Sequence, residues 1–202
     1  MPNHGFPYQI ILGILRVNPG ASPEEFATTI GTQYLNYYGE TDNVTMSVVD
    51  LERISDLVTA INIFGDLLNQ NFNNYVNEIE IARYSSQNYA IASYMDIYDF
   101  AERIMFQITQ TDIVTAAQQV KEAVNHTIIF SGYKGFPVSS SHGIAIFFPL
   151  SSEDPSIWND VDGNSYQDLD FVNDLHAAPQ WNEFIIDYYY SLLFNTSKKE
   201  IL

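Results

Sequence analysis

The chain has 202 residues, 46% of them hydrophobic, and a formal net charge of −17 from 25 acidic and 8 basic side chains. Its length and apolar content predict one globular domain over residues 1–202. The charge argues against nucleic acid and anionic membrane surfaces as partners, because both require clustered Lys and Arg. Cationic partners, such as a metal ion or a basic peptide, remain permitted. The sequence contains no cysteine, so this chain has no disulfide, thiolate metal site or cysteine nucleophile.

We expect neither a membrane span nor a signal peptide from the sequence pattern. No apolar run approaches the roughly 18 residues that a membrane span needs. Residues 1–5 lack the basic start and the apolar core of a signal peptide. We therefore expect a soluble protein, and the pattern leaves its compartment undecided.

Two helices are predicted at the start of the chain. Residues 7–15 form a short apolar segment with Pro7 at the first turn of a helix. Ser22 is followed by Pro and then by Glu25, which is the spacing of a capping box. We expect a second helix over residues 23–38 that ends before a glycine.

A strand and a long helix are predicted next. Residues 44–49 are rich in β-branched side chains and alternate loosely, which indicates a strand. Asp50 is expected to cap an amphipathic helix that extends through residue 68. Residues 69–77 are rich in asparagine and should fray or turn. Residues 78–84 fit either a strand or a helix.

The middle of the chain predicts two more helices and a second strand. A helix is expected to begin at residue 95 and to reach about residue 108. Thr111 or Asp112 should cap the next helix, which extends to Val124. Residues 126–133 are expected to form a buried strand.

The apolar run at residues 143–148 is the centre of the predicted fold. It is apolar on both alternating faces and ends at Pro149, as does a strand that is covered on both sides. Residues 181–194 predict an apolar, Tyr-rich helix. Alternation of strands and helices predicts the α/β class, with a mixed or mostly parallel sheet of few strands flanked by helices.

His142 follows Ser139, Ser140 and Ser141, so a Ser/His hydrolase is one candidate activity. A nucleophile elbow needs a strained turn of the Gly-x-Ser-x-Gly kind, and the sequence has none here. A histidine that enters a buried strand is more often structural, and we favour that interpretation.

Asp160, Asp162 and Asn164 place oxygen ligands on alternate residues, as the start of a calcium loop does. The calcium loop of EF-hands needs Gly at its sixth position and Glu at its twelfth, where this chain has Ser165 and Phe171. Turn chemistry explains the same residues. We keep the three as a candidate ligand-binding site and predict no metal or cofactor, with calcium as the alternative.

Asp96 and Asp99 are three residues apart, so they share one face of the predicted helix. A paired-carboxylate site would have this spacing. Acidic side chains also stabilise the first turn of any helix through its dipole, and this is the interpretation we favour.

Several segments, taken in order, resemble the clostripain family of cysteine peptidases, which have a caspase-like fold. The ordered set covers nearly the whole chain. The segments are Gly5-Phe6-Pro7-Tyr8 with Ile11-Leu12, Asn18-Pro19 with Ser22-Pro23-Glu24-Glu25, Met46-Ser47-Val48-Val49-Asp50-Leu51, Asp96-Ile97-Tyr98-Asp99-Phe100-Ala101, His142 to Pro149, and Trp181 with Phe184 and Tyr188.

The resemblance implies a position within the family rather than an activity. Family members carry the catalytic His in a His-Gly context and the Cys in an Asp-x-Cys context, both before the Gly-Phe-Pro-Tyr-like segment. His142-Gly143 lies on a later strand of the family pattern, so no catalytic role is transferred to it. The resemblance thus predicts a non-catalytic C-terminal part, inactive alone, that complements a separate catalytic chain and turns exposed apolar surface near residues 6–8 toward it. A free-standing acidic binding module, with or without calcium, and a Ser/His hydrolase are the alternatives.

Overall fold

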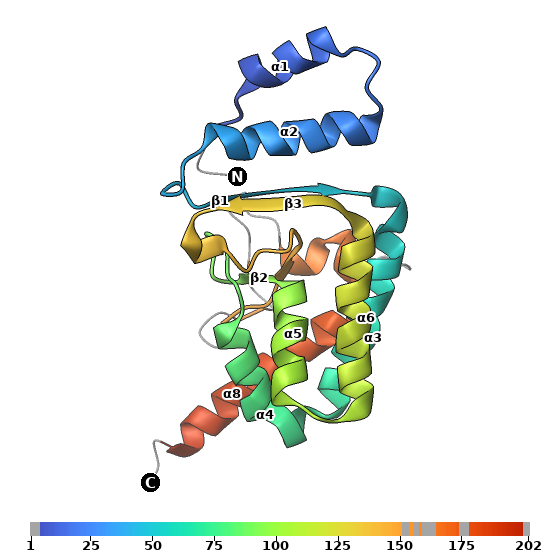
Figure 1. Cartoon of the computed structure of the whole chain (residues 1–202). Coiled ribbons are helices and arrows are strands. Elements are labelled where there is room, and N and C mark those ends of the chain that lie inside the picture. Colours follow the sequence, from blue (N-terminus) through green and yellow to red (C-terminus); the bar gives the residue numbers. More distant parts are fainter. Residues whose placement is uncertain (1–4, 151–153, 156–157, 159–164, 174–177, 200–202) are drawn as a thin grey trace.

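The computed structural model describes residues 5–150, 154–155, 158, 165–173 and 178–199 (Figure 1). It is a mixed α/β arrangement in which helices predominate. Its helices are α1 Tyr8–Val17, α2 Pro23–Tyr37, α3 Ile54–Gln70, α4 Phe72–Ser85, α5 Ile97–Gln107, α6 Thr111–Thr127, α7 Asp170–Asn173 and α8 Pro179–Lys199. Its strands are β1 Val44–Val49, β2 Tyr94–Asp96, β3 Ile128–Lys134 and β4 Ala145–Phe147, and short 3-10 turns are η1 Leu51–Arg53, η2 Phe136–Val138 and η3 Tyr166–Asp168.

Helices α1 and α2 form a layer at one end of the molecule (Figure 1). The predicted capping box is confirmed, because Glu25 N donates to Ser22 Oγ (3.2 Å) and Ser22 N donates to Glu25 Oε2 (2.8 Å). Helix α2 packs on β1 and β3, whereas α1 packs on α2 and buries only Ile11. The α1–α2 layer therefore meets the rest of the protein through α2.

The strands β1 and β3 form a two-stranded antiparallel sheet, in which Val44 lies opposite Lys134. The register shifts between Val48 and Val49, which produces a bulge. The expectation of a mixed or mostly parallel sheet was wrong for the described residues, where the pairing of β2 with β4 is antiparallel too. Two neighbouring strands that are joined by one crossover helix are parallel. In this chain β1 and β3 are separated by four helices, α3 to α6, so the connection does not require them to be parallel.

The apolar run at residues 143–148 contributes a strand of three residues, β4, and not the centre of a large sheet. Ile146, Phe147 and Phe148 are nevertheless buried, as predicted. Their covering comes from aromatic side chains: Trp181 lies 5.7 Å from the Phe148 ring, and its indole N–H donates to the Phe147 carbonyl at 3.1 Å. The run is buried by helix packing, which the alternating pattern alone cannot distinguish from burial inside a sheet.

Most of the hydrophobic core lies among α3, α4, α5, α6 and α8, which pack on one another beneath the β1–β3 sheet (Figure 1). Helix α3 and helix α8 approach closely, since a Cβ added at Gly65 would lie 2.7 Å from Trp181 Cα. The turn predicted at residues 69–77 is reduced to Asn71, and a kink at Tyr75 interrupts α4. Residues 78–84, which fitted strand or helix, lie in this helix.

Two predicted boundaries shift. Asp50 caps η1 by accepting from Glu52 N at 3.0 Å, and α3 begins only after that turn. Helix α6 continues to Thr127, so β3 begins at Ile128, and its side chains alternate in exposure where full burial was expected. Among the described helices, none combines the length and the apolar character that crossing a bilayer requires.

Candidate functional site

The carboxylate of Asp96 is the centre of a buried polar cluster beneath the β1–β3 sheet. Asp96 ends β2 and is the N-cap of α5, and it has no exposed surface. It accepts hydrogen bonds from Tyr89 Oη (2.7 Å), from the backbone N–H of His142 (2.7 Å) and from the backbone N–H of Asp99 (3.0 Å). These three donors replace the water that a buried carboxylate loses.

Asp99 lies one helical turn further along α5 and is also buried. Its carboxylate accepts from Gln87 N at 2.7 Å and forms an ion pair with Arg103 Nη2 at 3.2 Å. The predicted first-turn position is confirmed for Asp99. Asp96 is the N-cap rather than a residue of the first turn, and β4 and the segment around residues 86–89 bury both acids.

His142 lies beside Asp96 in the loop that leads into β4. Its Nδ1 is 3.4 Å from Asp96 Oδ1, which is long for a hydrogen bond, so we describe the contact as an ion pair. The imidazole stacks on Tyr98 with 4.0 Å between ring centroids and 20° between planes. Burial lowers the pKa of His142, but the contact with Asp96 and the charges of Asp99 and Glu102 outweigh burial and raise it above 6.5.

Ser141 Oγ is hydrogen-bonded to Tyr89 Oη at 2.8 Å. Tyr89 therefore connects Ser141 to Asp96, and burial together with the Asp96 charge raises the pKa of its phenol. Within the described part of the chain, no hydrogen bond joins the His142 ring to Ser139, Ser140 or Ser141. The arrangement does not assemble the Ser–His pair that the hydrolase alternative requires.

Gly143 holds this loop against the sheet. Its φ of +101° favours glycine, and a Cβ there would lie 2.9 Å from Ser47 Cβ and 3.1 Å from Ser131 Oγ. The Gly143 carbonyl accepts from Ser47 Oγ at 2.8 Å. The contacts of Gly143 with Ser47 of β1 and Ser131 of β3 therefore hold the loop that carries Ser141 and His142 against the sheet.

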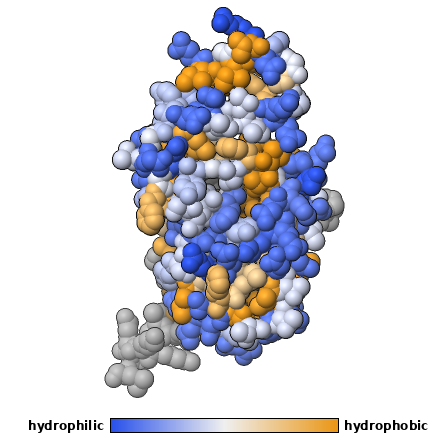
Figure 2. All heavy atoms as spheres, viewed as in Figure 1, coloured by the Kyte–Doolittle hydropathy of each residue, from blue (hydrophilic) through white to orange (hydrophobic). Residues whose placement is uncertain are grey.

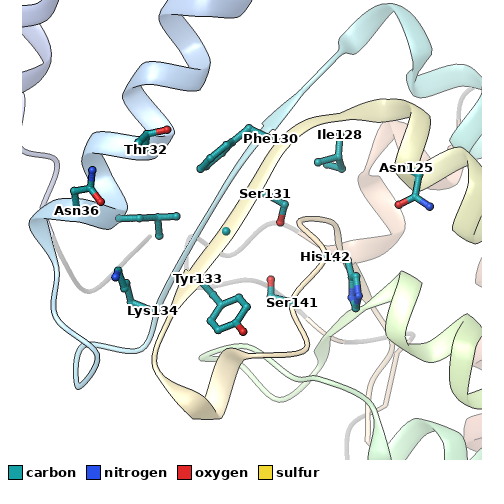
Figure 3. A pocket seen from close by; sticks show the side chains of 12 residues that line it. Thr32, Asn36, Asn125, Ile128, Phe130, Ser131, Tyr133, Lys134, Ser141 and His142 are labelled. Carbon is teal, nitrogen blue, oxygen red and sulfur yellow. The ribbon is translucent and has the colours of Figure 1, made fainter.

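Two hollows flank the β1–β3 sheet, one beside each strand. The hollow beside β3 has a volume of about 630 Å³ and lies between α2 and the His142 loop (Figure 3). It is lined by Thr32, Leu35, Asn36, Asn125, Ile128, Phe130, Ser131, Gly132, Tyr133, Lys134, Ser141 and His142.

The hollow beside β1 has a volume of about 450 Å³. It is lined by Phe6, Tyr34, Thr45, Met46, Ser47, Tyr89, Ser141, Gly143 and Ala145. Ser141 contributes to both hollows, so the loop of residues 139–144 forms a floor that they share.

The candidate ligands Asp160, Asp162 and Asn164 lie outside the described residues. Elsewhere in the described part, no group of three or more His, Asp or Glu side chains is placed to hold a metal ion. Sequence reasoning missed Tyr89 and Gln87, which come from an irregular segment without any motif. For Asp96 a signal existed, because an Asp three residues before a second acid at a helix start is the spacing of an N-cap.

The described residues form an α/β protein with a buried acidic cluster at the start of α5. Its sequence contains no cysteine. The clostripain family model matches residues 1–189, and the chain belongs to that family. Searches of curated proteins and of solved structures found no match.

Proposed function

We propose that this chain is the non-catalytic C-terminal part of a clostripain-like peptidase, with a caspase-like fold that is completed by a separate catalytic chain. The observation that carries the proposal is the absence of cysteine from a sequence that matches a cysteine peptidase family over residues 1–189. Peptide hydrolysis through a thiolate needs that sulfur. The catalytic chain would supply the His-Gly and Asp-x-Cys motifs.

Exposed apolar side chains on α1 support a docking role for the N-terminal edge. Leu12 is 61% exposed and Val17 75% exposed, and Tyr8, Ile10 and Leu15 are exposed as well. Figure 2 shows hydrophobic residues gathered over α1, at the end of the molecule. Contiguous apolar surface of this kind is typical of a protein interface.

The hollow beside β1 supports the same docking direction. Phe6 packs on Tyr34 with 5.2 Å between ring centroids, and both rings line this hollow next to Thr45 and Met46. Among the described strands, β1 pairs only with β3, so its other edge is open to a further strand. A strand of the catalytic chain that pairs there would extend the sheet and cover Phe6.

Complementation tests the proposal. The chain is mixed with a separately produced catalytic chain of the family that carries the His-Gly and Asp-x-Cys motifs, and peptidase activity is measured with each part alone and with both. We expect no activity from this chain alone and activity in the mixture. If the two chains form no complex at micromolar concentration, the proposal is wrong.

A matched pair of leucine variants locates the docking surface. Leu12→Asp places a charge on the exposed face of α1, whereas Leu51→Asp makes the same change at η1, where the leucine is 76% exposed. We expect Leu12→Asp to weaken the complex by about tenfold or more, because burying an unpaired carboxylate is costly. Leu51→Asp should leave the affinity unchanged, and equal effects in both variants would exclude α1 from the interface. Isothermal titration calorimetry provides the measurement.

A further inference from the structure

The outer edge of β3 has the features of a strand that accepts another strand. Within the described residues β3 pairs with β1 on one side only. In an antiparallel pair, the N–H and C=O groups of alternate residues point away from the partner, so about half of those in β3 face outward. Lys134 at its end is the strand's one charged residue, and β3 contains no proline. Charge and proline, two of the usual protections of an edge strand, are therefore missing along most of its length.

The edge is recessed between two walls. Thr32 and Asn36 of α2 lie on one side of the 630 Å³ hollow, and Ser141 and His142 lie on the other, with β3 between them (Figure 3). A single extended chain fits between such walls. The edge of a second folded copy does not, because its own α2 and loop would meet these walls before the strands could pair.

We propose that this hollow binds an extended peptide segment of net positive charge, which adds to β3 as a third strand. Charge decides between occupants: at a net charge of −17, a second copy of the chain is repelled and a basic segment is attracted. The cations that line the hollow do not oppose a basic segment strongly, because Lys134 is paired with Glu40 at 3.0 Å and His142 with Asp96 at 3.4 Å. The inference concerns the β3 edge and does not depend on docking at β1.

The two walls predict an alternating side-chain preference in the added strand. Toward α2 the hollow offers apolar surface from Leu35 and Phe130. Toward the loop it offers the hydroxyls of Ser131 and Ser141 and the imidazole of His142. Successive side chains of a strand point to opposite faces, so apolar residues should alternate with polar or basic ones.

The probe is an end-capped peptide of seven residues, the length of β3, that alternates valine with lysine. Binding is measured by fluorescence anisotropy of a labelled peptide. We expect saturable binding that weakens as salt is raised. A peptide of the same sequence with N-methyl groups on every residue has no backbone donor on either edge and should bind at least about tenfold more weakly. An alternating valine and glutamate peptide should not bind.

A matched pair of threonine variants places the peptide in the hollow. Thr32→Arg fills the hollow from the exposed surface of α2, and Thr59→Arg makes the same change on the exposed surface of α3. The two threonines are equivalent locally, since each hydroxyl donates to the carbonyl four residues earlier, at 2.9 Å and 2.8 Å. Thr32→Arg should weaken peptide binding by about tenfold or more through steric and charge repulsion, and Thr59→Arg should not.

Hydrogen exchange supplies the second readout. Peptide binding should slow exchange of the outward-facing amides of β3 and leave those of α8 unchanged. The inference is overturned if no saturable binding occurs, if the N-methylated peptide binds equally well, or if Thr32→Arg and Thr59→Arg bind alike. A salt-dependent dimer with protected β3 amides would identify a second copy as the occupant and would also overturn it. None of these results bears on complementation at α1 and β1.

Discussion

Asp96 and His142 form an ion pair with unequal exposure, since the carboxylate is fully buried and the imidazole side chain is 34% exposed. Solvent can exchange the proton of His142 while Asp96 keeps its three donors. The hydrogen bond from the backbone N–H of His142 to Asp96 joins residues that are 46 positions apart in the chain. The protonation of His142 should therefore be visible in the stability of the whole fold.

The raised pKa of His142 predicts a specific pH dependence. A group whose pKa is higher in the folded than in the unfolded state adds stability below its unfolded pKa, near 6.5, and that stability is lost as pH rises through the folded pKa. The difference in unfolding free energy between the native chain and His142→Gln should therefore shrink as pH increases from about 6 to about 9. Urea unfolding followed by circular dichroism measures it.

The matched control for this measurement is His126→Gln, which removes an exposed histidine from α6. If the two variants show the same pH dependence, the contact with Asp96 does not determine the titration of His142. Repeating the series at high salt should reduce the effect only partly, because the buried carboxylate is shielded from counterions.

At the scale of single residues, local rules predicted the caps and not the cluster. Ser22 and Asp50 were identified as caps because their partners lie within three residues. The contact of Asp96 with His142 is made across the fold, the contact with Tyr89 comes from an irregular segment, and no local spacing encodes either of them. This is why the spacing of the two acids predicted their place at the start of α5 and not the cluster around them.

At the scale of elements, the packing of α3 against α8 depends on Gly65. A Cβ there would lie 2.7 Å from the Trp181 backbone, so Gly65→Ala forces the two helices apart. We expect a loss of about 1–3 kcal/mol in unfolding free energy despite alanine's better helix propensity. Gly13→Ala in α1 is the matched control, because nothing lies within 4 Å of its added Cβ.

Chemical denaturation of the two alanine variants decides this prediction. Gly13→Ala should be neutral or stabilising by up to about 1 kcal/mol, since it only restricts the unfolded chain. A neutral Gly65→Ala would show that α3 and α8 can separate without cost.

Element type could be predicted for most of the chain, and element partners could not. The periodic patterns of α2, α3, α5 and α6 identified helices with boundaries within a few residues of those observed. The apolar run at residues 143–148 was assigned to a sheet centre because burial by helices leaves the same pattern as burial by strands. Strand direction was wrong because the sequence does not indicate which strands pair across four intervening helices.

At the scale of the whole molecule, the hydrophobic core is divided. One large cluster lies among α3, α4, α5, α6 and α8, and a small one, built on Tyr34, Leu35 and Val44, joins α2 to the sheet. Less buried apolar surface gives a lower cost of local opening. We expect the amides of α2 to exchange faster than those of α3 and α6 in native-state hydrogen exchange.

Equal protection of α2 and α3 would contradict this division and would indicate one cooperative unit. Binding of the proposed catalytic chain gives a further comparison, because a partner that covers α1 and Phe6 should slow the exchange of α2 selectively. The free and bound chains are compared under the same conditions.

The division of the core also confines the tryptophans to one of its two clusters. Both tryptophans of the chain, Trp158 and Trp181, belong to the large cluster. The small cluster holds Tyr34 and Tyr38 without tryptophan. Light absorbed only by indole therefore reports on the helical body and not on the layer above the sheet. Tyrosine emission comes from both clusters, since Tyr166 and Tyr188 belong to the large one. Unfolding of the helical body can thus be followed selectively without attaching a dye.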